Sequence, residues 1–192
     1  MNDLLIAATQ SAIESEQGQQ QYLSFLLQGE AFAIDILHIK EIIEYGQVTA
    51  VPMMPKFLRG VINLRGAVVP VIDLNARFGR EPSAIGRRTC IVIVEVQLQE
   101  QTQVVGVVVD TVNAVLDIPA DTLEPPPAFG AGIRTDFIAA MAKLEQGFLI
   151  VLNLNRILSW QELAALLPGS SQPDSSQPGN FQPAQEPAEK RS

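Results

Sequence analysis

The stretch KFLRGVINLRGAVVPVIDLNARF, from Lys56 to Phe78, decides the fold of this 192-residue chain. Apolar residues fill almost every position from Val61 to Leu74. A run of this kind is typical of largely buried strands joined by a tight turn. Arg65 and Gly66 interrupt the run, so the sequence predicts an arginine that needs a charged partner.

The natural partner for Arg65 is Glu41. This glutamate stands in ILHIKEII, where Ile36, Ile39 and Ile42 have helix-like spacing, and burial of that segment would bring the carboxylate near the sheet. A partly buried arginine–carboxylate pair costs desolvation, and removing one partner costs about 3 to 5 kcal/mol. We therefore predict a partly buried Glu41–Arg65 ion pair that fixes geometry more than it adds stability.

The chain also repeats its own apolar pattern. Three pairs of segments match, at offsets of 68, 73 and 80 residues: 23–26 with 91–94, 32–43 with 105–116, and 63–75 with 143–155. Because the offset rises along the chain, the second copy has extra residues, first within its first hairpin and then in the long connection before its last matching segment. We expect such insertions in loops. The alternative is a chance likeness between Val-rich strands.

Short strands, separated by turn signals and duplicated once, predict a mainly β fold. We expect two small five-stranded antiparallel barrels, SH3-like and packed together, with short helices and a C-terminal helix. The expected boundaries are a leader at 1–20, one domain at 21–167 and a disordered Pro/Ser/Gln-rich tail at 168–192. Within the domain we expect the first barrel at about 21–80, the second at about 88–155 and the helix at 155–167.

Composition excludes several classes of function. A net charge of -8 argues against non-specific binding to nucleic acid or anionic lipid. The N-terminus has neither the basic region of a signal peptide nor an apolar run long enough to cross a membrane, so we expect a cytoplasmic protein. Cys90 is the only cysteine and has apolar neighbours, which predicts a buried thiol in a strand.

The residues for catalysis or metal binding are also too few. His38 is the only histidine, and neither it nor Cys90 has the context of a catalytic triad or a zinc site. No glycine-rich phosphate loop follows a strand. Asp73 and Asp110 each end an apolar strand, where a carboxylate commonly caps the following turn. We expect no enzymatic activity, no metal and no cofactor.

The segment FLRGVINLRGAVVPVIDL resembles the signature of CheW-type chemotaxis coupling proteins. The likeness continues through GEAFAIDILHIKEII, VVGVVVDTVNAVLDI and EPPPAFGAGIRTDFIAAMAKLEQGFLIVLNLNRIL, and it covers about Tyr22 to Leu167. One departure from the family pattern is Ala139-Ala140, where Arg-Gly or a similar pair is usual.

The resemblance implies a non-catalytic adaptor in bacterial chemotaxis signal transduction. Its expected partners are the cytoplasmic tips of chemoreceptors (methyl-accepting chemotaxis proteins), the regulatory domain of a CheA-type histidine autokinase, and other copies of itself in rings. Its expected place is the cytoplasm, at membrane-bound receptor arrays. By this resemblance, the receptor-binding residues are Ile39, Glu41, Ile42, Gly60, Arg65, Gly66 and Val68, and the kinase-binding residues are Val105, Gly106 and Val108.

Two other readings remain open on the sequence. The same fold could serve a twitching-motility or second-messenger pathway, or belong to a fragment of a larger kinase. A small-molecule-binding or hydrolytic barrel would need a polar pocket with convergent groups, for which Glu41, Arg65 and His38 are the candidates.

Overall fold

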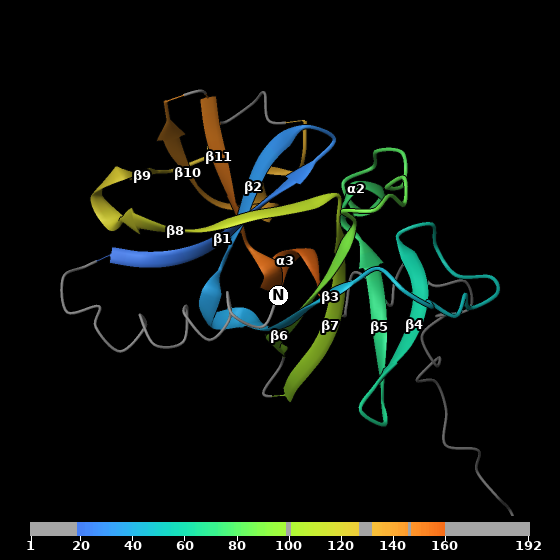
Figure 1. The fold of residues 1–192 in the computed structure, drawn as a ribbon. Helices are drawn as coiled ribbons and strands as arrows, with labels where there is room; N and C mark the ends of the chain where they lie inside the picture. Colours follow the sequence, from blue (N-terminus) through green and yellow to red (C-terminus); the bar gives the residue numbers. More distant parts are fainter. Residues whose placement is uncertain (1–18, 99–100, 127–131, 146, 160–192) are drawn as a thin grey trace, which may run out of the picture.

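The structure is a computed structural model that describes residues 19–98, 101–126, 132–145 and 147–159 (Figure 1). The expected leader therefore lies outside the described residues, apart from Gln19 and Gln20, which begin the first strand. The expected tail at 168–192 lies outside them entirely.

Eleven strands and a few single helical turns make up the described part of the chain. In chain order they are β1 (Gln19–Leu27), β2 (Glu30–Asp35), η1 (Ile36–His38), β3 (Ile39–Glu44), β4 (Leu58–Leu64), β5 (Ala67–Asp73), α2 (Leu74–Arg77), β6 (Cys90–Leu98), β7 (Gln101–Val109), β8 (Thr111–Pro119), η2 (Ala120–Thr122), β9 (Leu123–Glu124), η3 (Thr135–Phe137), β10 (Ile138–Leu144), β11 (Gly147–Leu152) and α3 (Leu154–Ile157).

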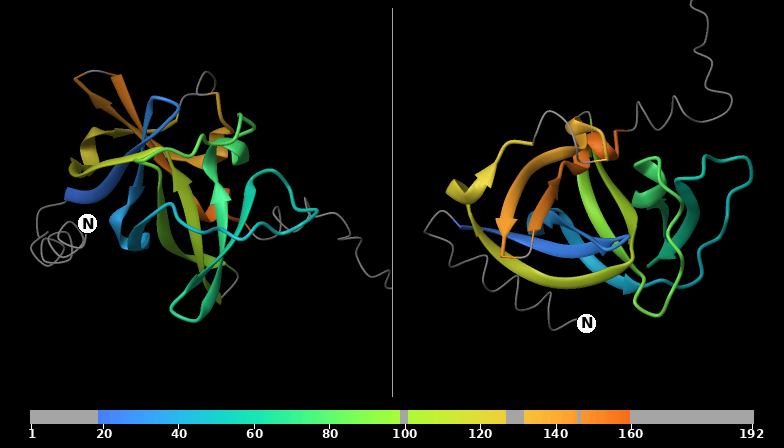
Figure 2. Two further views of the ribbon diagram at one scale, coloured as in Figure 1. Left: turned by 45° about the vertical axis from the view of Figure 1, so that its right-hand side comes forward. Right: turned by 90° about the horizontal axis from the view of Figure 1, so that it is seen from above.

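The strands form two sheets, which confirms a mainly β fold with two β domains. Sheet A has the order β8-β1-β2-β11-β10-β9, and sheet B has the order β3-β6-β7-β5-β4. Figures 1 and 2 show the outer strands of sheet A on one side of the molecule and β4 and β5 on the other. Sheet A has a sixth strand because the short β9 pairs with β10. Neither sheet is wholly antiparallel, since β2 runs parallel to β11 and β7 runs parallel to β5.

The expected division into a barrel at 21–80 and a barrel at 88–155 is wrong in its strand assignment. The first hairpin of each half is exchanged: β1 and β2 belong to sheet A with β8 to β11, and β6 and β7 belong to sheet B with β3 to β5. An apolar run predicts that a strand is buried on both faces, but it does not specify which neighbour the strand pairs with. The exchange leaves the hydrophobic pattern unchanged, so the sequence could not reveal it.

The duplication itself is confirmed by the topology. Each strand of sheet B has a counterpart in sheet A at the matching sequence offset. The order β3-β6-β7-β5-β4 of sheet B corresponds in this way to β8-β1-β2-β11-β10, which is the order of sheet A without β9. The parallel pair Val71–Gly106 has its counterpart in Val151–Ala33. Even the irregularities match, because the register shifts between Ile39 and Glu41 in β3 and at the equivalent place in β8.

The helix-like spacing of Ile39 and Ile42 has another cause. Apart from the single turn η1, this segment is the strand β3, with a register shift at Lys40. The extra residue lets Ile39 and Ile42 face the same way although three positions separate them, because a bulge places two residues opposite one. The extra residues of the second copy's first hairpin also lie in strands rather than in a loop, since the β6–β7 ladder reaches Leu98 and Gln101.

One large core joins the two sheets, and a smaller cluster lies within each sheet's own unit. Arg77, on α2, spans the junction: its guanidinium lies 4.7 Å from the ring centre of Phe137, and its Nε donates to the Ile157 carbonyl at 2.9 Å.

Asp73 caps α2 through the Ala76 N–H, as expected. Within the described residues the C-terminal helix expected at 155–167 is only the single turn α3, which begins at Leu154 and ends at Ile157; the part from 160 onward lies outside the described residues.

Candidate protein-interaction surfaces

The turn between β4 and β5 explains why Arg65 interrupts an apolar run. Arg65 and Gly66 have φ values of 52° and 89°, and a two-residue hairpin with positive φ at both positions matches the twist of the strands. The Asn63 side chain accepts from the Gly66 N–H at 2.9 Å and fixes the turn. A non-glycine residue in this region costs roughly 1 kcal/mol or more, so Arg65 is retained there against its backbone preference.

Arg65 pairs with Glu41 across the sheet. Its Nη2 donates to Glu41 Oε2 at 3.0 Å. The pair is less buried than the sequence predicts, because the Arg65 side chain is 81% exposed at the hairpin tip while that of Glu41 is 21% exposed. Water screens such a pair, whose contribution to folding is about 0 to 1 kcal/mol. Its effect is to hold the hairpin tip beside β3.

A shallow groove lies between that tip and β3. We call it the hairpin groove; its volume is about 420 Å³. Val69 and Val104 supply apolar lining, and Glu41 and Arg65 place their ion pair at its edge. Lys40 adds a second ion pair there, with Glu95. Val68 is 71% exposed beside the tip, and it points to the other face of β5 from Val69 because neighbouring residues of a strand alternate.

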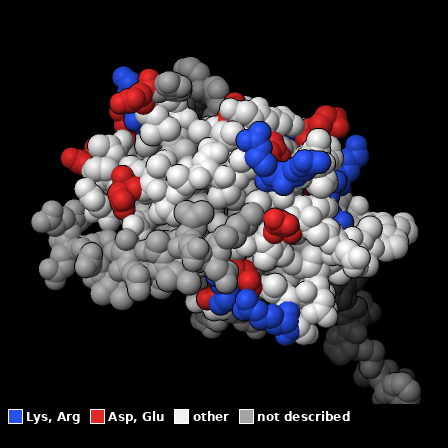
Figure 3. All heavy atoms as spheres, viewed as in Figure 1, with Lys and Arg blue, Asp and Glu red and all other residues white. Residues whose placement is uncertain are grey.

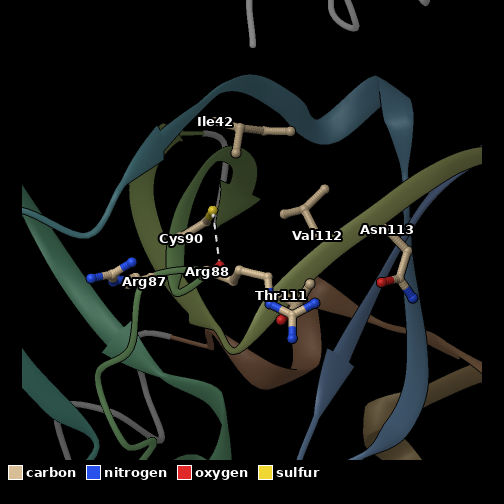
Figure 4. Close-up of a pocket in the computed structure, with 7 residues that line it drawn as sticks. All are labelled: Ile42, Arg87, Arg88, Cys90, Thr111, Val112 and Asn113. Carbon is tan, nitrogen blue, oxygen red and sulfur yellow. Dashed lines mark hydrogen bonds between the residues drawn. The ribbon is translucent and has the colours of Figure 1, made fainter.

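The opposite face of β3 borders a second groove, where β3 and β8, the edge strands of the two sheets, come together (Figure 4). We call it the β3–β8 groove; its volume is about 200 Å³. In Figure 4 the side chains of Ile42, Cys90 and Val112 point into it, Arg87 points away at its border, and Arg88 extends toward Thr111. The full lining is Ile42, Arg87, Arg88, Cys90, Thr111, Val112 and Asn113.

Cys90 gives this groove a neutral floor. Burial raises the pKa of the Cys90 thiol, nearby Glu44 raises it further, and the Val112 N–H lowers it by a smaller amount. The thiol is therefore protonated at neutral pH, so the residue acts as a small apolar side chain. The buried strand thiol predicted for Cys90 is present.

The residues expected to bind a receptor thus fall on different parts of the molecule. Glu41 and Arg65 meet in the hairpin groove, whereas Ile42 lies in the β3–β8 groove. Gly60 is buried, and a Cβ built on it would lie 2.1 Å from the Thr49 carbonyl oxygen. Gly60 therefore allows a close backbone approach and offers no side-chain contact to a partner.

The residues expected to bind the kinase are not on the surface. Val105, Gly106 and Val108 are buried in β7, a strand with neighbours on both sides. A Cβ on Gly106 would lie 2.7 Å from the side chain of Ile91. These residues are therefore not exposed in the free chain, and their part in kinase binding stays a prediction. Valines of an internal strand and valines of an interface give the same sequence pattern.

The residues that a hydrolytic or ligand-binding site would need do not converge. His38 Nδ1 lies 3.1 Å from the Glu95 carbonyl oxygen and does not line the hairpin groove with Glu41 and Arg65. Within the described ranges no cluster of His, Cys, Asp and Glu could hold a metal ion. The described part of the chain also has no helix long and apolar enough to cross a membrane.

Comparison with known proteins agrees with this arrangement. A family model described as CheW-like domain matches residues 21–162. The chain belongs to this family.

Its relatives include the chemotaxis protein CheW of Klebsiella aerogenes, 36% identical over 157 residues that cover 82% of this chain and 92% of the relative. CheW of Bacillus subtilis is 31% identical over 150 residues, which cover 78% of this chain and 93% of that relative. The crystal structure of the scaffolding protein TtCheW from Thermoanaerobacter tengcongensis matches with a TM-score of 0.67 and 32% identity, covering 74% of this chain and 90% of that one. This CheW-like protein is accordingly a non-catalytic coupling adaptor of bacterial chemotaxis.

Sequence reasoning missed the two arginines at the border of the β3–β8 groove. Arg87-Arg88 is the longest basic run in the globular part, and a pair of this length does not by itself indicate a binding site. Both side chains are exposed, and no ion pair to either is present among the described residues. Figure 3 shows both basic and acidic side chains in several separate groups on the face viewed in Figure 1.

Proposed function

We propose that this CheW-like protein couples the cytoplasmic tips of chemoreceptors to a CheA-type histidine autokinase, and that the receptor binds at β3. The observation that carries the proposal is the position of β3, which borders the hairpin groove on one face and the β3–β8 groove on the other. A partner laid along β3 would reach the charged Glu41–Arg65 pair and the apolar Ile42 together.

The chemistry of these grooves favours a protein partner that dissociates readily. The β3–β8 groove, at about 200 Å³, is smaller than the roughly 300 to 1,000 Å³ of small-molecule sites and fits an inserted side chain. The hairpin groove carries a screened ion pair, which gives orientation more than affinity. Micromolar contacts, worth about 8 kcal/mol each, are sufficient in an array because multivalent attachment supplies the remaining avidity.

The kinase requires a separate surface, and the buried residues of β7 do not provide one in the free chain. We infer that the regulatory domain of the kinase docks elsewhere on the exposed surface, which leaves β3 free for the receptor. Binding to both partners at once places the protein in the cytoplasm at the receptor array, alongside other copies of itself.

Substitution of Arg65 by Ala tests the receptor site. We expect Arg65→Ala to fold, with a free energy of unfolding within about 1 kcal/mol of wild type, because the ion pair is exposed. It should lose most receptor-dependent kinase activation when it is combined with purified kinase and receptor-containing membranes. Glu145→Ala, at the equivalent position of the β10–β11 hairpin, is the matched control and should activate normally. Normal coupling by Arg65→Ala would remove Arg65 from the receptor site.

Co-purification from native lysate, with the full chain as bait, would identify the pathway. Wild-type protein should recover a chemoreceptor and a histidine kinase, and Arg65→Ala should recover less receptor with unchanged kinase. Recovery of twitching-motility components would keep the adaptor role and change the pathway. Recovery of neither partner by wild type would contradict the coupling function.

A further inference from the structure

The β3–β8 groove combines two features that the role of an adaptor does not by itself require. Its floor is small and apolar, formed by Ile42, Cys90 and Val112, while Arg87 and Arg88 stand at its border (Figure 4). Two exposed arginines, adjacent in sequence, on a chain with a net charge of -8 form a local positive site against the sign of the whole molecule.

We propose that Arg87 and Arg88 are specificity-determining residues that select a partner segment carrying an acidic side chain next to an apolar one. The apolar side chain enters the groove, and the carboxylate pairs with a guanidinium group at its border. This proposal rests on the proposed function, since the partner is the receptor segment that binds along β3.

The geometry supports one inserted side chain with one charged neighbour. The floor residues come from β3, β6 and β8, so the groove is closed below by strands of both sheets. Arginine suits the border because its planar fork matches a carboxylate in a bidentate contact. In Figure 4 Arg88 extends toward Thr111, and the two arginines leave the chain in different directions, so together they cover more than one approach of an acidic residue.

The local charge balance determines the sign of the partner. Glu44, on β3 opposite Cys90, is the acidic neighbour whose field raises the pKa of that thiol. Against this one carboxylate stand two arginines that have no ion pair with any described residue. The border therefore carries excess positive charge, which attracts an acidic segment and disfavours a basic one.

Charge reversal provides the test, with full-length protein and native membranes that carry the chemoreceptors as the probe. Arg87→Glu combined with Arg88→Glu should weaken co-sedimentation with these membranes about tenfold at 50 mM salt, because like charges would then face each other. Most of this difference should disappear at 500 mM salt, where exposed charges are screened. Arg87→Lys with Arg88→Lys keeps the charge and should bind within about threefold of wild type.

A second double variant separates a local effect from net charge. Lys143→Glu with Arg156→Glu changes the total charge by the same amount at exposed positions of β10 and α3, and it should bind like wild type. Equal weakening by both double variants would overturn the proposal. Loss of binding to purified kinase, with receptor binding unchanged, would also overturn it.

Asn113→Trp separates failure of this proposal from failure of the proposed function. Asn113 is exposed and lines the groove, so an indole there obstructs entry while the core stays intact. Suppose that Asn113→Trp binds membranes weakly while Arg87→Glu/Arg88→Glu binds normally. The partner would then occupy the groove, and only the proposed role of the two arginines would be overturned. Normal binding by both of these and by Arg65→Ala would overturn receptor docking at β3 as well.

Discussion

The β4–β5 and β10–β11 hairpins are equivalent elements of a duplicated fold, and they differ most at their tips. Both expose an apolar residue at the same position, Val68 at 71% and Phe148 at 56%. Arg65 at the first tip is replaced by Glu145 at the second, and its partner Glu41 is replaced by Ala114 in β8. Only the first copy can form the ion pair. The two copies therefore share the residues that the fold needs and differ in the residues available for recognition.

The bases of the same hairpins show a second difference, which concerns stability. In the first copy, Thr49 and Val61 exchange backbone hydrogen bonds of 2.9 Å, and the chain at Thr49 passes directly over Gly60. In the second copy the corresponding contact is the β9–β10 pairing, and the residue at the position of Gly60 is Ala140. Only one copy therefore depends on a glycine.

Gly60→Ala should have the largest effect on stability. The new Cβ would overlap the Thr49 carbonyl, and φ at this position is 145°, in a region that side chains disfavour. Overpacking and backbone strain together predict a loss of about 2 to 6 kcal/mol, measured by urea denaturation. The reciprocal change Ala140→Gly should cost only about 1 kcal/mol, for the added flexibility of the unfolded chain. Equal losses would mean that the chain at Thr49 moves aside readily.

The caps of α2 and α3 provide the next comparison. Asp73 is fully buried and accepts from Arg59 Nε at 2.8 Å and from the Ser83 N–H at 2.9 Å, besides capping α2. Its counterpart Asn153 accepts from the Arg156 N–H at 3.3 Å as the cap of α3. The carboxylate thus also fixes the connection after α2, which leads to Arg87 and Arg88.

Asp73→Ala should cost about 3 to 5 kcal/mol, because it leaves the half-buried Arg59 without its carboxylate. Asn153→Ala should cost about 1 kcal/mol, the usual value of a helix cap. Both values come from urea unfolding followed by circular dichroism. A similar loss for the two variants would show that Arg59 and Ser83 find other partners when the carboxylate is absent.

The same comparison indicates what the sequence could predict. The repeated apolar pattern predicted the duplication and the fold class, because burial alternates with strand geometry whatever the pairing. It also gave Glu41 as the partner of Arg65, since few acidic residues stand near an otherwise apolar sheet. The apolar pattern could not predict the exchange of β1–β2 with β6–β7 between the sheets, because both arrangements bury the same residues.

The candidate site was harder to predict than the fold. The sequence could not show that Val105 and Val108 are internal while Val68 is exposed, because all three stand in similar Val-rich strands. It also gave no sign that Arg87 and Arg88 border a groove, since they follow a loop and meet β8 only in the folded chain. Solvent exposure depends on the position of a strand within its sheet, and local pattern does not contain this information.

Cys90 and Tyr22 provide the last and smallest comparison. They are equivalent buried positions of β6 and β1, and burial raises the pKa of both groups, with smaller contributions from Glu44 and Asp35 respectively. Each group is neutral when protonated, and its proton leaves the unfolded chain at a lower pH than the folded one. The resulting stability is therefore complete below the unfolded pKa and is lost as the pH rises toward the folded pKa.

The loss should begin near the ordinary pKa of each group, at about pH 8.5 for the thiol and about pH 10 for the phenol. We expect the free energy of unfolding of wild type to fall between pH 8 and 10.5. Cys90→Val should remove the first part of this slope, and Tyr22→Phe should remove the second. The slopes are compared rather than the absolute stabilities, because each substitution also changes packing. An unchanged slope between pH 8 and 9.5 in Cys90→Val would mean that the floor of the β3–β8 groove opens to water often enough for the thiolate to form.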